Sequence, residues 1–150
     1  MSARVNLGKA APELYHAVSS LDKLASQATK SAGLDEGFCH LLKLRASQLN
    51  QCAFCVRMHT RDALASGEST DRLSVLTAWR ETEYFTQKER AALELVEAIT
   101  LISDGQVPDS VYAKAVEALS SEEMVAIEWL SVVINTWTRI ATSSRYPVKA

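Results

Sequence analysis

Residues 41–69, LLKLRASQLNQCAFCVRMHTRDALASGES, carry the signals from which both the fold and the chemistry of this chain can be inferred. Helix formers dominate on both sides of Asn50 and Gln51, which interrupt the apolar rhythm. Immediately after this break come Cys52, Cys55 and His59, in a C-x-x-C-x-x-x-H string. The stretch therefore predicts two helices joined by a short turn, with both cysteines at the start of the second helix, residues 52–66.

The rest of the chain is also typical of helices. Five glycines and three prolines in 150 residues leave little material for turns, and runs that alternate apolar and polar residues are scarce. Capping residues mark helix starts at Asp35, at Ser69 or Thr70, and at Thr86, where Glu89 completes a capping box. We expect an all-α fold, and the absence of a linker or repeat predicts a single domain over residues 1–150.

Two of the expected helices have contrasting apolar patterns. The first, residues 11–32, has one apolar stripe at near-helical spacing, formed by Leu14, Val18, Leu21 and Leu24. In the last, residues 120–144, Val132, Val133 and Ile140 widen the apolar arc beyond one stripe. A helix this apolar is expected to be buried on several sides, either in the core or at a subunit contact.

Charge and hydropathy exclude several classes of function. The net charge is −2 with both signs mixed along the chain, which lacks the basic face of a nucleic-acid-binding protein and gives no attraction to an anionic membrane surface. No apolar run approaches the ~20 residues of a membrane span, and the first residues lack the order of a secretory signal. We therefore expect a cytoplasmic protein. In a reducing compartment a C-x-x-C pair is more often catalytic or metal-binding than a structural disulfide.

The C-x-x-C-x-x-x-H string has the elements of a redox-active dithiol. On a helix Cys52, Cys55 and His59 lie at i, i+3 and i+7, so all three share one face. A helix N-terminus and a neighbouring thiol can lower a cysteine pKa from about 8.5 to ~3.5–7.5, which produces the nucleophilic thiolate. His59 can then take a proton from Cys55 or stabilise its anion. Arg45 and Arg57 lie near the string and could hold thiolate or substrate charge.

Two other interpretations of the string remain open. Zinc prefers four tetrahedral ligands, and Cys52, Cys55 and His59 supply three, with Cys39 or His40 as the fourth. Alternatively, the residues are packed in the core, since cysteine is often buried and inert.

A second stretch, RLSVLTAWRETEYFTQKERAALELVEAIT at residues 72–100, makes the pattern more specific. Together with LRASQLN, C-A-F-C and the following M-H, it resembles the carboxymuconolactone decarboxylase superfamily, and within it the AhpD-like alkylhydroperoxidase group. The resemblance runs from about residue 36 to 103 and continues more loosely to the C-terminus. It implies an all-helical AhpD-like domain with the dithiol at a helix N-terminus, assembled as a homo-oligomer, either a trimer or a hexamer.

The resemblance also implies thiol-dependent reduction of hydroperoxides, with an external dithiol as electron donor and no cofactor or metal ion. Cys55 matches the more reactive cysteine, Cys52 its disulfide partner and His59 the histidine of the proton relay. The family relay also uses a glutamate twelve residues before the first cysteine, where this chain has His40. The alternative is a redox-sensing or antioxidant-accessory oligomer without turnover. Lactone decarboxylation fits less well, because that chemistry does not require a C-x-x-C.

Overall fold

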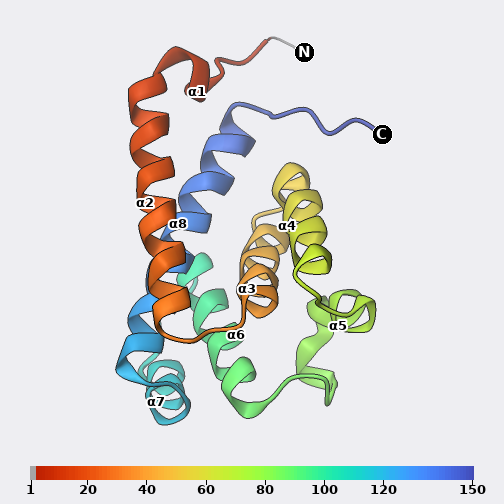
Figure 1. The fold of residues 1–150 in the computed structure, drawn as a ribbon, viewed down its shortest axis with the longest axis vertical. Coiled ribbons are helices and arrows are strands. Elements are labelled where there is room, and N and C mark those ends of the chain that lie inside the picture. The colour runs from red at the N-terminus through yellow and green to blue at the C-terminus, as the bar shows by residue number, and fades with distance from the viewer. Residues whose placement is uncertain (1–2) are drawn as a thin grey trace.

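The computed structural model describes residues 3–150, and all the regular secondary structure in this part of the chain is helical (Figure 1). This confirms the all-α expectation. No described helix has the length and hydropathy needed to cross a membrane. In chain order the elements are α1 (Leu7–Ala10), α2 (Pro12–Ser31), α3 (Glu36–Leu49), α4 (Ala53–Ala65), α5 (Thr70–Val75), η1 (Leu76–Glu81), α6 (Gln87–Thr100), α7 (Asp109–Ala118) and α8 (Ser121–Ser143).

The expected helix caps are present in the structure. Asp35 accepts a hydrogen bond from the backbone N–H of Phe38 at the start of α3. Both α6 and α8 begin with a complete capping box, formed by Thr86 with Glu89 in α6 and by an equivalent serine and glutamate pair in α8. These caps satisfy backbone donors that have no partner within the helix, and so they determine where each helix starts.

Helices α3 and α4 form an antiparallel hairpin whose turn carries the first cysteine (Figure 1). Gln51 has a φ of 54°, the left-handed conformation that ends many helices. Its N–H bonds to the carbonyl of Gln48, and the N–H of Cys52 bonds to the carbonyl of Ser47, both at 3.0 Å. These two bonds form a Schellman motif, and the residue that completes it, Cys52, is also the N-cap of α4.

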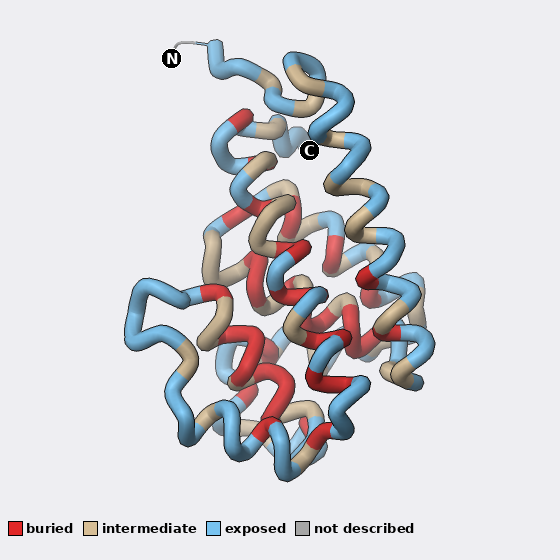
Figure 2. The backbone as a smooth tube through the Cα atoms, turned by 90° about the vertical axis from the view of Figure 1, so that its left-hand side faces the viewer, coloured by how far each residue is buried: buried red, intermediate tan, exposed pale blue. Residues whose placement is uncertain are grey.

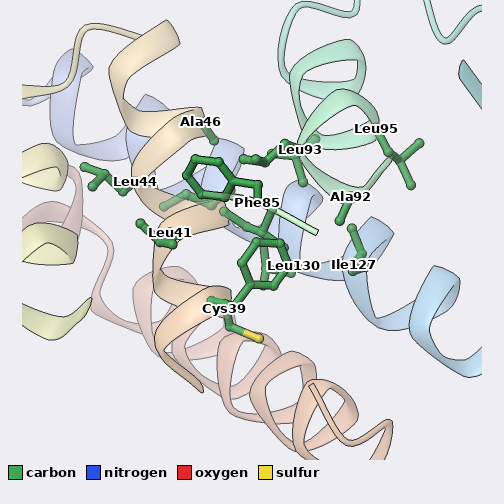
Figure 3. Close-up of a cluster of buried hydrophobic side chains, with 14 of the residues drawn as sticks. Cys39, Leu41, Leu44, Ala46, Phe85, Ala92, Leu93, Leu95, Ile127 and Leu130 are labelled. Carbon is green, nitrogen blue, oxygen red and sulfur yellow. The ribbon is translucent and has the colours of Figure 1, made fainter. Parts of the chain in front are cut away.

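The main core lies between α3, α6 and α8, with Phe85 packed against them (Figures 2 and 3). On α3, Phe38, Leu41 and Leu42 are buried. Cys39 is a free cysteine, 5% exposed, and it packs in this same core. Cys52 and Cys55 belong to a separate cluster of buried residues. Because α3 contacts α4, α6 and α8, the core fixes the position of the helix hairpin that carries the C-x-x-C.

Three segments differ from the sequence-based expectation. The apolar stripe of the first long helix is only partly covered, since Leu14 and Leu24 are 71% and 63% exposed while Val18 and Leu21 are half-buried. This helix, α2, runs antiparallel to α8 along one side of the molecule and buries only Ala25 and Thr29 (Figure 1). The single helix expected after Ser69 is divided into α5 and the 3-10 helix η1. The short helix α1 was not anticipated.

Candidate functional site

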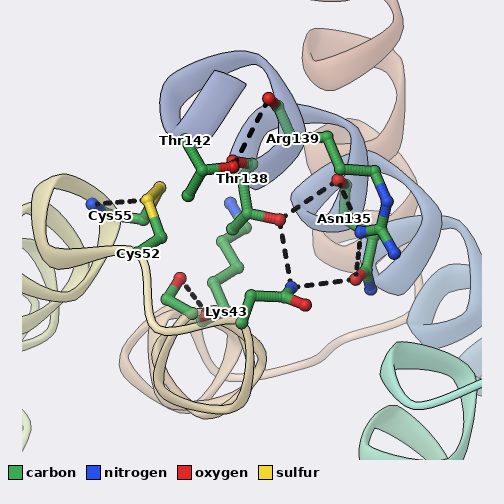
Figure 4. Close-up of a disulfide and its surroundings, with 9 residues drawn as sticks. Lys43, Cys52, Cys55, Asn135, Thr138, Arg139 and Thr142 are labelled. Carbon is green, nitrogen blue, oxygen red and sulfur yellow. Dashed lines mark hydrogen bonds between the residues drawn. A yellow bond between two sulfur atoms is a disulfide. The ribbon is translucent and has the colours of Figure 1, made fainter. Parts of the chain in front are cut away.

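Cys52 and Cys55 are joined by a disulfide at the N-terminus of α4 (Figure 4). Their Cα atoms are 5.3 Å apart, and the residues are 2% and 1% exposed. Cys52 precedes the first turn of the helix and has extended backbone dihedrals, rather than being its first helical residue. Its Sγ accepts a hydrogen bond from the backbone N–H of Cys55 at 3.3 Å. A sulfur in this position is placed to gain from the helix dipole when it carries negative charge.

The turn that holds the disulfide is attached to α8 by side-chain hydrogen bonds (Figure 4). The Nδ2 of Asn50 donates to Oδ1 of Asn135 and to Oγ1 of Thr138, both at 3.0 Å. Asn135 in turn donates to Oγ1 of Thr100 on α6. The cysteines therefore lie at a turn that is tied to α8 by hydrogen bonds.

A cavity of about 260 Å³ opens beside the disulfide. Cys55 is one of the residues that line it, whereas Cys52 is not, so the two cysteines differ in their relation to this space. Most of the wall is apolar or aromatic, and it comes from α2, α4, α8 and the segment after α8. The lining residues are Tyr15, Ser19, Asp22, Lys43, Phe54, Cys55, Met58, His59, Val133, Ile134, Trp137, Ala141 and Tyr146.

Two histidines lie next to each other behind the dithiol. His59 on α4 is 6% exposed, and its ring stacks against that of His40 on α3 with centroids 6.0 Å apart. Burial lowers the pKa of His59 to about 3, helped by the nearby charge of Lys43. Burial and Lys43 also lower the pKa of His40. Both rings are therefore neutral at physiological pH, the form in which an imidazole can accept a proton.

The structure corrects the expectation about nearby arginines. The Nε of Arg45 donates to Oε1 of Glu97 at 2.7 Å, so the guanidinium is held by a carboxylate on α6 and does not reach the cavity. Arg57 donates to the carbonyl of Lys149. The cation that does line the cavity is Lys43, which extends from α3 toward α8 (Figure 4).

Sequence reasoning missed three charged residues of this site, Asp22, Lys43 and Asp62. Lys43 lies in a helix where a lysine is normally read as a solvated surface residue, and no local pattern distinguishes it. Asp62 follows His59 by three residues, so it lies on the same helix face, and that spacing is a signal that could have been used. Its Oδ2 is 3.6 Å from Nδ1 of His59 and 4.0 Å from Nδ1 of His40.

Comparison with known proteins identifies the family of this chain. The carboxymuconolactone decarboxylase family model matches residues 12–98, more than half of the chain. The chain belongs to this family. It is 39% identical to the uncharacterized protein YdfG of Bacillus subtilis over 141 residues, 94% of this chain and 93% of YdfG. It is 24% identical to the uncharacterized protein YnjA of Escherichia coli over 120 residues, 80% of this chain and 65% of YnjA.

A solved structure resembles this family member over nearly its whole length. A crystal structure of a protein of unknown function from Agrobacterium tumefaciens superposes with a TM-score of 0.88 at 39% identity, covering 99% of this chain and 100% of the other. A role as the antioxidant defence protein AhpD has been suggested for that protein. The helical fold with its C-x-x-C is therefore the AhpD-like fold, and the Cys52–Cys55 disulfide is compatible with a redox role.

Proposed function

We propose that this protein is a thiol-dependent peroxidase and disulfide oxidoreductase that uses the Cys52 and Cys55 pair. The observation that supports this proposal is the disulfide at the N-terminus of α4 with one of its two cysteines, Cys55, in the wall of a largely apolar cavity. The cavity admits the alkyl part of a hydroperoxide to Cys55, and the helix N-terminus favours the thiolate form that the chemistry requires. A cytoplasmic setting is part of the proposal, because a dithiol donor must regenerate the pair.

The oxidative half of the reaction begins at Cys55. Its thiolate attacks the distal oxygen of the hydroperoxide and the O–O bond breaks, so the alkoxide leaves, takes a proton and departs as the alcohol. Cys55 is left as a sulfenic acid. The thiolate of Cys52 then attacks the sulfur of Cys55, forms the disulfide and releases hydroxide, which becomes water on protonation. Cysteine sulfur is oxidised by two electrons and the peroxide is reduced by two.

The reductive half of the reaction also takes place at Cys55, the cysteine that lines the cavity. A thiolate of the external dithiol donor reaches the sulfur of Cys55 from the cavity and displaces Cys52 as the leaving thiolate. The backbone N–H of Cys55 bonds to the sulfur of Cys52 and stabilises its negative charge. The second donor thiol then resolves the mixed disulfide, which releases oxidised donor and leaves both cysteines reduced.

Proton transfer is assigned to the two histidines. His59 follows Cys55 by one helical turn, and both line the cavity. In this proposal the neutral ring of His59 accepts the proton of the Cys55 thiol at one nitrogen while its other nitrogen releases a proton toward His40, so that no buried imidazolium forms. The reverse shift protonates the alkoxide. His40 is the next group in the path, stacked on His59 and occupying the position of the family glutamate. Asp62, between the two rings and half exposed, connects them to solvent.

The test of this function is a turnover assay with cumene hydroperoxide and a dithiol donor, together with the variant Cys52→Ser. We expect the wild-type chain to consume several equivalents of peroxide per disulfide pair. We expect Cys52→Ser to react once and to accumulate a sulfenic acid at Cys55, detectable by dimedone labelling and mass spectrometry. Slow oxidation of the wild-type protein without turnover would contradict the peroxidase proposal and favour the redox-sensing alternative.

We also propose that the protein is a homo-oligomer, as AhpD-like relatives imply. The outer face of α8 carries three exposed apolar side chains at spacings of four and three residues, Val125, Trp129 and Val132, which are 57%, 48% and 45% exposed. Such a row is favourable at a subunit contact. Sedimentation should give the mass of a trimer or hexamer, and Trp129→Glu should shift the protein toward smaller species. A monomeric wild-type protein would contradict this proposal.

A further inference from the structure

A second cluster of polar groups lies between α3 and α4, beside the dithiol. It consists of His40, His59 and Asp62, which can each direct one ligand atom toward a shared space with all three atoms within 4.8 Å of one another. The Oδ2 of Asp62 is 3.6 Å from Nδ1 of His59 and 4.0 Å from Nδ1 of His40. At these separations neither ring nitrogen forms a hydrogen bond with the carboxylate.

The ring nitrogens of this cluster are buried without partners in the described part of the chain. Both nitrogens of His59 and Nδ1 of His40 are inaccessible to solvent and make no hydrogen bond. His59 is 94% buried, since it is only 6% exposed. A buried polar atom without a partner costs free energy of roughly 1–3 kcal/mol, so three of them together are unusual in a native protein. A ligand that accepts one nitrogen lone pair from each ring would satisfy Nδ1 of both histidines.

We propose that His40, His59 and Asp62 form a binding site for a divalent transition-metal ion of the zinc class. Two neutral imidazoles and one carboxylate are ligands that zinc and similar ions prefer, and they leave one or more positions open. Zinc holds such atoms at about 2.0–2.2 Å, so the ligand atoms of a tetrahedral site lie roughly 3.4 Å apart. The 3.6 and 4.0 Å separations from Asp62 need only a small contraction, which its half-exposed side chain can supply. The ligand nitrogens of the two rings, which lie within 4.8 Å of each other, also have to approach when the ion binds.

Some of the surrounding charges oppose a bound cation and others favour it. Lys43 lies close enough to influence the charge of both rings and opposes a bound cation. The carboxylates of Glu36 and Asp22 act on His40 in the opposite sense and favour a cation. The site requires none of the sulfur chemistry proposed above. If that chemistry occurs, a bound ion would occupy the nitrogen lone pairs and block proton transfer until it dissociates.

The experiment is calorimetric titration of Zn²⁺ into metal-free protein whose disulfide is intact, so that sulfur cannot coordinate the ion. We expect one ion per chain. Asp62→Asn should weaken the affinity by roughly tenfold or more, and thermal unfolding would verify that this partly exposed variant remains folded. The control is His16→Gln, which changes the exposed histidine of α2 and should leave the affinity unchanged.

A gain-of-affinity variant completes the test, because a misfolded protein cannot produce it. Lys43→Met removes the opposing charge and should tighten Zn²⁺ binding severalfold at low ionic strength. The proposal is overturned if the disulfide form binds no zinc, or if Asp62→Asn and Lys43→Met both leave the affinity unchanged. It is also overturned if zinc binds only after reduction and binding is lost in Cys52→Ser, because the sulfurs would then be the ligands. Each outcome is independent of peroxidase activity.

Discussion

Cys55→Ser is expected to abolish hydroperoxide turnover, leaving a rate no higher than that of the protein-free reaction. The serine hydroxyl is not ionised at neutral pH and cannot replace the thiolate as a nucleophile toward peroxide oxygen. The other cysteine of the pair, Cys52, and the buried Cys39 do not line the cavity, so the substrate cannot reach them by the same route. The measurement is steady-state consumption of cumene hydroperoxide with a dithiol donor in excess.

Two histidine variants separate loss of the nucleophile from loss of proton transfer. His59→Gln should lower the turnover rate by roughly a hundredfold while keeping both cysteines, because general acid-base assistance is removed. His16→Gln changes an exposed histidine on α2 and should leave the rate unchanged. If Cys55→Ser retains wild-type turnover, Cys55 is not the attacking residue, and its place in the cavity wall does not matter for catalysis.

The features predicted correctly from the sequence are those with local causes. Asp35, Ser69 and Thr86 cap helices because a side-chain oxygen meets a free backbone N–H within three residues, a relation that nearby residues determine. The position of the dithiol at a helix N-terminus has the same origin, since Asn50 and Gln51 break the helix pattern just before Cys52. These relations need no knowledge of how the helices pack.

The features that sequence reasoning missed depend on packing between distant segments. The spacing of Leu14 and Leu24 predicts an apolar face on α2, but it cannot show how little of this face the neighbouring helices α1 and α8 cover. Lys43 reaches the cavity only because α8 passes beside α3, and Arg45 is withdrawn from the site only because α6 supplies Glu97. His40 was assigned through family resemblance, since its stacking on His59 depends on the register between α3 and α4.

Arg45 is part of a buried ionic network that links α3, the helix that carries His40 and Lys43, to α6. Glu97 on α6 is 9% exposed. Its Oε1 accepts hydrogen bonds from Nε of Arg45 at 2.7 Å and from Nε1 of Trp79 at 2.8 Å. Its Oε2 is 2.7 Å from Nη1 of Arg80. Burial alone would raise the pKa of Glu97, but the three donors outweigh it and lower the pKa below its ordinary value of 4.5.

Glu97→Gln is expected to lower the free energy of unfolding at pH 7 by about 3–5 kcal/mol, the usual cost of breaking a buried ion pair. The amide keeps the shape of the side chain but leaves the guanidinium of Arg45 buried without a counter-charge. Urea unfolding followed by circular dichroism measures the loss. The matched control is Glu94→Gln, on the same helix as Glu97. It removes a partly exposed ion pair with Lys114 of α7, and we expect its effect to be below about 1 kcal/mol.

The pH dependence distinguishes the charge of Glu97 from its packing. Because folding lowers the pKa of this carboxylate, its stabilising effect is fully present above pH 4.5 and is lost as the pH falls through the lower folded value. The stability difference between wild type and Glu97→Gln should therefore shrink as the pH is lowered below 4.5. A difference that stays constant from pH 7 into this range would show that the amide disturbs packing alone, and that α3 does not depend on the carboxylate charge for its position beside the dithiol.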